Sequence, residues 1–144
     1  MPHKLLEGQV APPQRRQVLG VQLGTVSRGM SMEPMSITEV SPEQLKTRLD
    51  RGDDLLVVDL RQPWEYHAGH IPGAVSLFIE EVPIRLSELP TDVDIVLQCW
   101  HGHTSLDVAA YMIQQGWLAS RIASLSGGIA GWVHTHGMTG LERA

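Results

Sequence analysis

The sequence predicts an α/β fold in which a largely parallel sheet is flanked by helices. Two strand candidates, residues 55–59 and 94–98, consist of an apolar run with a polar residue at one or both ends, which is typical of strands that are buried on both faces. Segments with helical spacing lie between the strand candidates, and glycines mark the ends of several helices. Because strands and helices alternate along the chain, we expect parallel strands that are joined by helical crossovers.

The first elements follow from local signals. Residues 37–40 are a short strand candidate, and Ser41, Pro42 and Gln44 then form a capping box with proline at the first helical position. The helix that begins here should end at Gly52, before the strand at 55–59. We expect a short helix or turn over 62–69, a tight turn over 71–73 and a short strand over 74–77.

The second half repeats the alternation. Residues 79–89 have helical spacing, but Pro83 interrupts them. After the strand at 94–98, a loop leads into a helix over about 105–115, which Gly116 ends. A last strand is expected over 121–125, and a last helix over 129–136.

The first 35 residues differ from the rest of the chain. They are rich in Gly, Pro and Gln, lack a clear period, and hold four basic against two acidic side chains, a net charge of +2. We therefore expect a flexible N-terminal extension over residues 1–35 and one domain over residues 36–144. A targeting peptide or translation from an upstream start, with Met30, Met32 or Met35 near the true beginning, are the alternatives for this segment.

Composition excludes several classes of function. The net charge of -5 argues against a nucleic-acid partner. No stretch approaches the roughly 18 apolar residues of a membrane-spanning helix, so we expect no membrane partner. The first residues show no apolar core of secretory type, so we expect no signal peptide, and the single cysteine excludes an internal disulfide. A free thiol fits a reducing compartment, so we expect the protein in the cytoplasm.

Cys99 directly follows the second buried strand, at the sheet edge where ligands bind in open α/β folds. The loop after it can surround the sulfur with backbone N–H groups, and the start of the next helix adds more. Both favour a thiolate, so we predict that Cys99 is a nucleophile. The alternative is a small buried hydrophobe. The predicted substrate-binding residues are those of the loop: Trp100, His101, Gly102, His103, Thr104 and Ser105.

The run Cys99-Trp-His-Gly-His-Thr-Ser resembles the active-site loop of rhodanese-type sulfurtransferases, which is usually Cys-x-x-Gly-x-Arg/Thr/Ser-Ser. Residues 58–74 and 125–132 resemble two further signatures of that family, in the same order, and the match covers about residues 36–138. The aromatic-His-Gly pattern is most similar to small single-domain bacterial thiosulfate sulfurtransferases. The resemblance implies a rhodanese-like fold: a five-stranded, mainly parallel sheet with helices on both faces.

The same resemblance implies a two-step covalent reaction without a cofactor. Cys99 takes sulfur from thiosulfate or a persulfide, and cyanide, a small thiol or a thiol protein then accepts it. We expect a monomer or a weak dimer. Two alternatives stay open. A phosphatase or arsenate reductase is disfavoured because such relatives carry Cys-x5-Arg where this chain has Ser105, and a non-catalytic sulfur carrier or partner-binding module would need only the fold and the thiol.

Other residues near the loop are expected to be structural. Asp59 and Arg61 should form a pair behind the site rather than bind substrate. Glu65 and His70 are interpreted as hydrogen-bonding scaffold, and Trp132 as part of the core.

Seven histidines raise the question of a metal site. Cys99, His101 and His103 alternate in the loop, and His134 and His136 form a His-x-His pair. A zinc site needs about four converging ligands. Because a loop that turns its N–H groups inward points its side chains outward, we expect no metal site.

Overall fold

The computed structural model describes residues 36–143, so the predicted extension over residues 1–35 lies outside the described part of the chain. Within that part, a five-stranded sheet has the order β1-β5-β4-β2-β3. All four neighbouring pairs are parallel, which confirms the predicted α/β fold and makes the sheet parallel throughout. The strands are β1 (Thr38–Val40), β2 (Leu55–Asp59), β3 (Val75–Ser76), β4 (Asp94–Gln98) and β5 (Ile122–Leu125).

Helices connect the strands as predicted, and the helical segment over 79–89 is interrupted near Pro83 as expected. The α-helices are α3 (Pro42–Arg51), α4 (Pro63–Ala68), α5 (Val82–Arg85), α6 (Thr104–Gln114) and α7 (Gly128–His136). The expected helix over 79–89 is divided into η2 (Ile79–Glu81), α5 and η3 (Leu86–Glu88). Pro83 lacks a backbone N–H and occupies the first turn of α5, so it begins a new helix instead of continuing one. A further 3₁₀ turn, η4 (Ala119–Arg121), precedes β5.

The start of α3 shows how closely local sequence determines an element. The Ser41 hydroxyl accepts from the Gln44 N–H at 3.0 Å, and the Gln44 side chain accepts from the Ser41 N–H at 2.9 Å. This reciprocal pair is the predicted capping box. Gly52 ends the helix in the left-handed conformation, at φ 78°.

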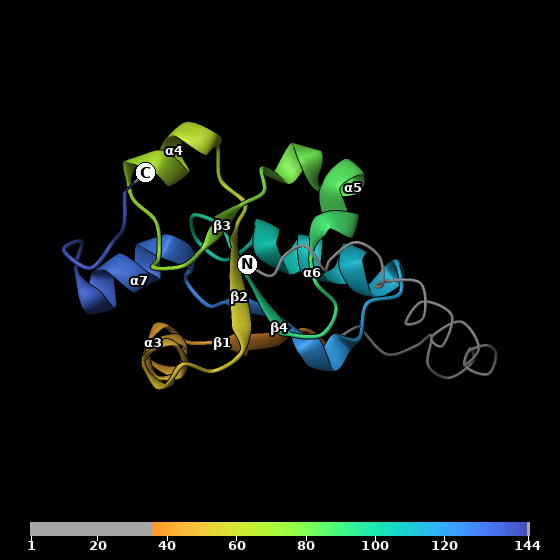
Figure 1. The fold of residues 1–144 in the computed structure, drawn as a ribbon, viewed down its shortest axis with the longest axis horizontal. Helices are drawn as coiled ribbons and strands as arrows, with labels where there is room; N and C mark the ends of the chain where they lie inside the picture. The colour runs from red at the N-terminus through yellow and green to blue at the C-terminus, as the bar shows by residue number, and fades with distance from the viewer. Residues whose placement is uncertain (1–35, 144) are drawn as a thin grey trace.

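Helices cover both faces of the sheet, with α3 and α7 on one side and α5 and α6 on the other (Figure 1). A cluster of buried hydrophobic residues lies between the sheet and the helices on each side. Successive residues of β4 point to opposite faces. Val96 belongs to the buried cluster of Leu45 in α3 and Trp132 in α7. Ile95 belongs to the cluster of Met112 in α6. Trp132 is thus a core residue, as expected from the sequence.

The carboxyl ends of the central strands lie together. Asp59 at the end of β2 pairs with Gln98 at the end of β4, and β4 lies beside β5. Because the strands are parallel, the segments that follow them emerge at one edge of the sheet. No helix within residues 36–143 is long and apolar enough to cross a membrane.

Candidate active site

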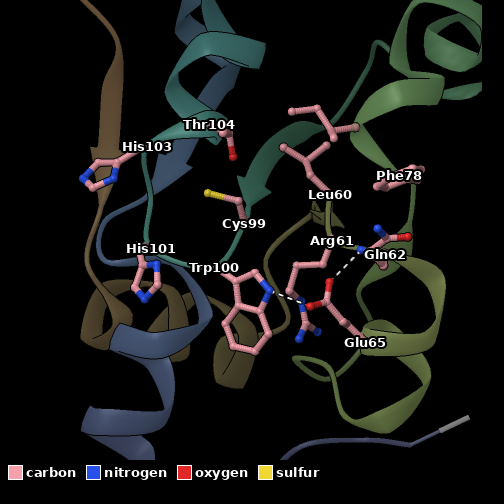
Figure 2. A pocket seen from close by; sticks show the side chains of 11 residues that line it. Leu60, Arg61, Gln62, Glu65, Phe78, Cys99, Trp100, His101, His103 and Thr104 are labelled. Carbon is pink, nitrogen blue, oxygen red and sulfur yellow. Dashed lines mark hydrogen bonds between the residues drawn. The ribbon is translucent and has the colours of Figure 1, made fainter.

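Cys99 lies at the base of a cavity of about 320 Å³ at this sheet edge. Figure 2 shows that the cavity wall comes from the loop after β4 on one side and from the segments after β2 and β3 on the other. Cys99 is 6% exposed, so the cavity is the route of its thiol to solvent. The lining residues are Leu60, Arg61, Gln62, Glu65, Phe78, Ile79, Cys99, Trp100, His101, His103 and Thr104.

The sulfur atom is surrounded by hydrogen-bond donors from its own loop. The backbone N–H groups of Gly102 and Ser105 donate to Cys99 Sγ at 3.2 and 3.4 Å. The Ser105 hydroxyl lies 3.3 Å from the same atom. Ser105 belongs to the first turn of α6, whose N-terminal end carries partial positive charge. These groups stabilise negative charge on the sulfur.

The balance of these effects lowers the pKa of the Cys99 thiol below its ordinary value. Burial alone raises the pKa, because a buried thiolate loses hydration. The hydroxyls of Ser105 and Thr104 and the two backbone N–H groups together outweigh that effect. The Thr104 hydroxyl faces the sulfur in Figure 2. A larger thiolate fraction makes Cys99 a better nucleophile near neutral pH.

Ser124 is a second hydroxyl residue behind Ser105, and sequence reasoning missed it. Both side chains are fully buried, and their oxygens are 2.7 Å apart. When the Ser105 hydroxyl donates to the thiolate, its oxygen can accept from Ser124, so the two hydroxyls form a chain that ends at the sulfur. A hydroxyl within the otherwise apolar run Ile122–Leu125 was the available signal.

The first turn of α7 supports the loop after β4 through backbone hydrogen bonds. The N–H groups of Ile129 and Ala130 donate to the carbonyl oxygens of Cys99 and Trp100 at 2.9 and 3.0 Å. Gly128 makes this contact possible, because a Cβ there would lie 2.5 Å from the Cys99 oxygen. Since the loop carbonyls point toward α7, the N–H of Gly102 is free to point at the sulfur. The sequence predicted the helix over 129–136, but not this support of the loop.

Asp59 and Arg61 form a buried ion pair, with Nη2 and Oδ2 2.7 Å apart. The guanidinium also donates to the carbonyl oxygen of Gly69 at 2.8 Å. Arg61 nevertheless reaches the cavity wall, where its Cζ lies 5.1 Å from the centre of the Trp100 ring. Arg61 is therefore part of a structural ion pair and also places its positive charge beside the Trp100 ring at the cavity wall.

Glu65 contributes more to the site than the sequence indicated. It was expected to be scaffold, and its Oε1 does accept from the N–H of Gln62 at 2.9 Å at the start of α4. Its Oε2, however, accepts from the indole N–H of Trp100 at 2.8 Å, and the side chain lines the cavity. Their separation of 35 residues left no local sequence signal for this contact. His70, the other scaffold candidate, stacks on Tyr66 and contacts its carbonyl oxygen through Nδ1.

The loop histidines lie at the cavity rim. His101 and His103 are exposed, and neither ring hydrogen-bonds to the Cys99 sulfur. His136 contacts the carbonyl oxygen of Pro42 through Nε2 at 3.0 Å, which joins α7 to α3. Among residues 36–143, no three His, Cys, Asp or Glu side chains are arranged to hold a metal ion.

Comparisons with known proteins agree with this geometry. Residues 41–135 match the rhodanese-like domain family. A protein of Allochromatium vinosum named "Sulfurtransferase" is 41% identical over 102 residues, which are 71% of this chain and 92% of that protein. "Thiosulfate sulfurtransferase GlpE" of Stutzerimonas stutzeri is 34% identical over 97 residues, 67% of this chain and 85% of that protein.

Solved structures show the same fold. A rhodanese-like domain protein from Staphylococcus aureus has a TM-score of 0.66 at 24% identity, over 75% of this chain and 99% of that one. The Alr3790 protein from Anabaena sp. has a TM-score of 0.64 at 26% identity, over 73% of this chain and 82% of that one. The sheet order, the loop around Cys99 and these relatives lead to one conclusion: the chain belongs to the rhodanese-like domain family.

Proposed function

We propose that the protein is a sulfurtransferase that carries sulfur as a persulfide on Cys99, with thiosulfate or another persulfide as donor. The observation that carries this proposal is the environment of the sulfur. Two backbone N–H groups and a buried hydroxyl converge on Cys99 Sγ at the base of an open cavity. The names of the similar proteins from Allochromatium and Stutzerimonas support the same class of reaction.

The first step is attack of the Cys99 thiolate on the outer sulfur of thiosulfate. A bond forms between the two sulfur atoms, the original sulfur–sulfur bond breaks, and sulfite leaves with its electron pair. Cys99 is then a persulfide whose outer sulfur carries the negative charge. The N–H groups of Gly102 and Ser105 act like an oxyanion hole, because they are already directed at the charge that changes position.

The second step discharges the persulfide. A nucleophile such as cyanide or a thiolate attacks the outer sulfur, and Cys99 leaves again as the thiolate. Cys99 is the one cysteine of this sequence, so an accepting thiol comes from a second molecule, either a small thiol or a thiol protein. An acceptor of either kind enters through the same cavity.

The charges around the cavity bear on the choice of donor. The Arg61 guanidinium is committed to Asp59, and the carboxylate of Glu65 lines the wall. Thiosulfate, a dianion, is therefore held mainly by the N–H groups of the loop. This arrangement is the reason to keep a persulfide, which carries less negative charge, as a second donor class.

A thiocyanate assay tests the proposal. Purified protein is mixed with thiosulfate and cyanide, and thiocyanate is measured against time and against the Cys99→Ser variant. We expect turnover by the wild-type chain, with saturation in both substrates in the parallel-line pattern of a ping-pong reaction. No turnover by the wild-type chain with thiosulfate or an organic persulfide, or equal turnover by Cys99→Ser, would contradict the proposal.

A further inference from the structure

A second, larger cavity lies beside the active site. Its volume is about 550 Å³, and it is bounded by α4, α7 and the segment before the C-terminus. Three residues, Arg61, Glu65 and Trp100, line both cavities. The remaining wall of the second cavity is mostly apolar and includes Trp64, Ala68, Ile129, Val133, Met138 and Leu141. The Trp100 indole therefore lies between the cavity that contains the Cys99 sulfur and the second, apolar cavity.

Trp100 is held in this position by few contacts. Its side chain is 46% exposed, so it is not fixed by core packing. Its indole N–H donates to Glu65 Oε2 at 2.8 Å, and one face of the ring lies near Arg61 (Figure 2). Glu65 is itself fixed, because its other oxygen accepts from the N–H of Gln62. A hydrogen bond to a charged group is stronger than one between neutral groups, so loss of this bond releases the indole.

We propose that Trp100 is a specificity-determining residue, held by Glu65, that divides the small active-site cavity from an apolar subsite for the organic group of a sulfur donor. With the indole in place, the site favours small donors. When the indole moves aside, the two spaces join and an apolar group attached to the transferred sulfur can enter the second cavity. This inference rests on the proposed sulfurtransferase function and names a substrate class for it.

Thiosulfonates, R–SO₂–S⁻, are suitable probes. The Cys99 thiolate attacks the terminal sulfur, a new sulfur–sulfur bond forms, and the sulfinate R–SO₂⁻ leaves with the electron pair of the broken bond. Methanethiosulfonate and benzenethiosulfonate carry the same charge and the same reacting group, and they differ mainly in the size of R. The measured quantity is the ratio of kcat/KM for benzenethiosulfonate to kcat/KM for methanethiosulfonate, with cyanide as acceptor.

The variants remove the indole or its hydrogen bond. We expect Trp100→Ala to raise the ratio about tenfold, the scale on which a pocket distinguishes apolar groups. Glu65→Met, which removes the acceptor oxygen of the indole N–H, should also raise the ratio, but by less than Trp100→Ala. Glu65→Gln keeps one acceptor oxygen for the two N–H groups, of Gln62 and Trp100, that the carboxylate serves, so it should raise the ratio less than Glu65→Met. Ile84→Ala is the control, because Ile84 is an exposed large side chain that lines neither cavity.

A double variant tests whether the second cavity receives the aromatic group. Val133→Phe narrows that cavity from the α7 side. In the Trp100→Ala background it should remove the gain for benzenethiosulfonate and leave the rate with methanethiosulfonate unchanged, a non-additive result that requires a shared space.

The outcomes separate this inference from the function on which it rests. The wild-type chain could transfer sulfur from methanethiosulfonate while the ratio stays unchanged in both Trp100→Ala and Glu65→Met. Trp100 would then not separate the two cavities, and the sulfurtransferase function would stand. If Val133→Phe fails to remove the gain, the second cavity is not the subsite. If the wild-type chain transfers sulfur from thiosulfate but neither it nor any variant uses either thiosulfonate, the apolar subsite is wrong and the sulfurtransferase function stands. If the wild-type chain transfers sulfur from neither these donors nor an organic persulfide, both proposals are wrong.

Discussion

The backbone N–H of Ile129 donates a hydrogen bond of 2.9 Å to the carbonyl oxygen of Cys99. The side-chain amide of Gln98 donates to the same oxygen at 3.2 Å. The first turn of α7 therefore sets the direction of the peptide group that follows the reactive residue. Since a peptide group is planar, fixing its carbonyl also fixes the N–H on its other side. The loop around the sulfur is thus shaped from outside as well as by its own sequence.

Gly128→Ala should disturb this support. A Cβ at position 128 would lie 2.5 Å from the Cys99 oxygen and from the carbonyl group of Trp100, and both are backbone atoms that cannot turn away. The loop must shift, and a displacement of about 1 Å near a reacting group costs on the order of a hundredfold in rate. We expect a loss of this size in thiocyanate formation.

Gly52→Ala is the matched control. Gly52 has φ 78° and Gly128 has φ 62°, so alanine is strained by its backbone conformation at both positions, but a Cβ at position 52 meets no atom within 4 Å. Gly52→Ala should therefore lower the free energy of unfolding by about 1 kcal/mol and leave the rate unchanged. Equal loss of rate in the two variants would show that strain alone, and not contact with the loop, explains the effect.

The hydroxyls of Ser105 and Ser124 should control the ionisation of Cys99. Ser105→Ala removes a donor to the thiolate and should raise the pKa of Cys99. Ser124→Ala should raise it less, because Ser124 acts through Ser105. The rate of alkylation by iodoacetamide against pH measures this pKa, and the single cysteine makes the label specific. Ser120→Ala, on the surface turn η4, should leave the midpoint unchanged.

The same ionisation links stability to pH. The pKa of Cys99 is lower in the folded chain than in the unfolded chain, so between these two values the unfolded state binds more protons. Stability from this group is complete above the unfolded value, about 8.5, and is lost as the pH falls through the folded value. Urea unfolding between these two pH values should show that the free energy of unfolding of the wild-type chain rises with pH, and that it rises less in Ser105→Ala. An identical rise in the two proteins would contradict the role of Ser105 in lowering the pKa of Cys99.

Asp59→Asn should destabilise the fold. It leaves the Arg61 guanidinium buried without its carboxylate partner, and breaking a buried pair in this way costs about 3 kcal/mol or more. Asp50→Asn makes the same chemical change in the exposed pair with Lys46 and should cost less than about 0.5 kcal/mol. Urea unfolding of both variants measures the difference, and a cost for Asp59→Asn as small as for Asp50→Asn would show that the pair is not structural.

Local sequence determined most of the fold. The apolar runs at β2 and β4 and the capping box at Ser41 depend on neighbouring residues, and each gave the correct element. The interruption expected at Pro83 within residues 79–89 is present, but the pattern of apolar residues did not show that this segment forms two 3₁₀ turns around a short α-helix. The sequence also identified the loop of Cys99, since its N–H donors lie within six residues.

The parts of the site that the sequence did not reveal depend on contacts between distant segments. Ser124 reaches Ser105 from β5, Glu65 reaches Trp100 from α4, and Ile129 reaches Cys99 from α7. Each of these contacts exists because parallel strands bring their carboxyl ends to one edge. Pattern and spacing predict the edge, but they do not predict which side chains meet there.

The persulfide on Cys99 is the central claim, and intact-protein mass spectrometry tests it most directly. The wild-type chain is incubated with thiosulfate, or with an organic persulfide, desalted without reductant and weighed beside Cys99→Ser. We predict a gain of one sulfur atom that maps to the peptide containing Cys99, is removed by cyanide, and is absent from the serine variant. No gain with either donor, or a gain that survives in Cys99→Ser, would contradict the account.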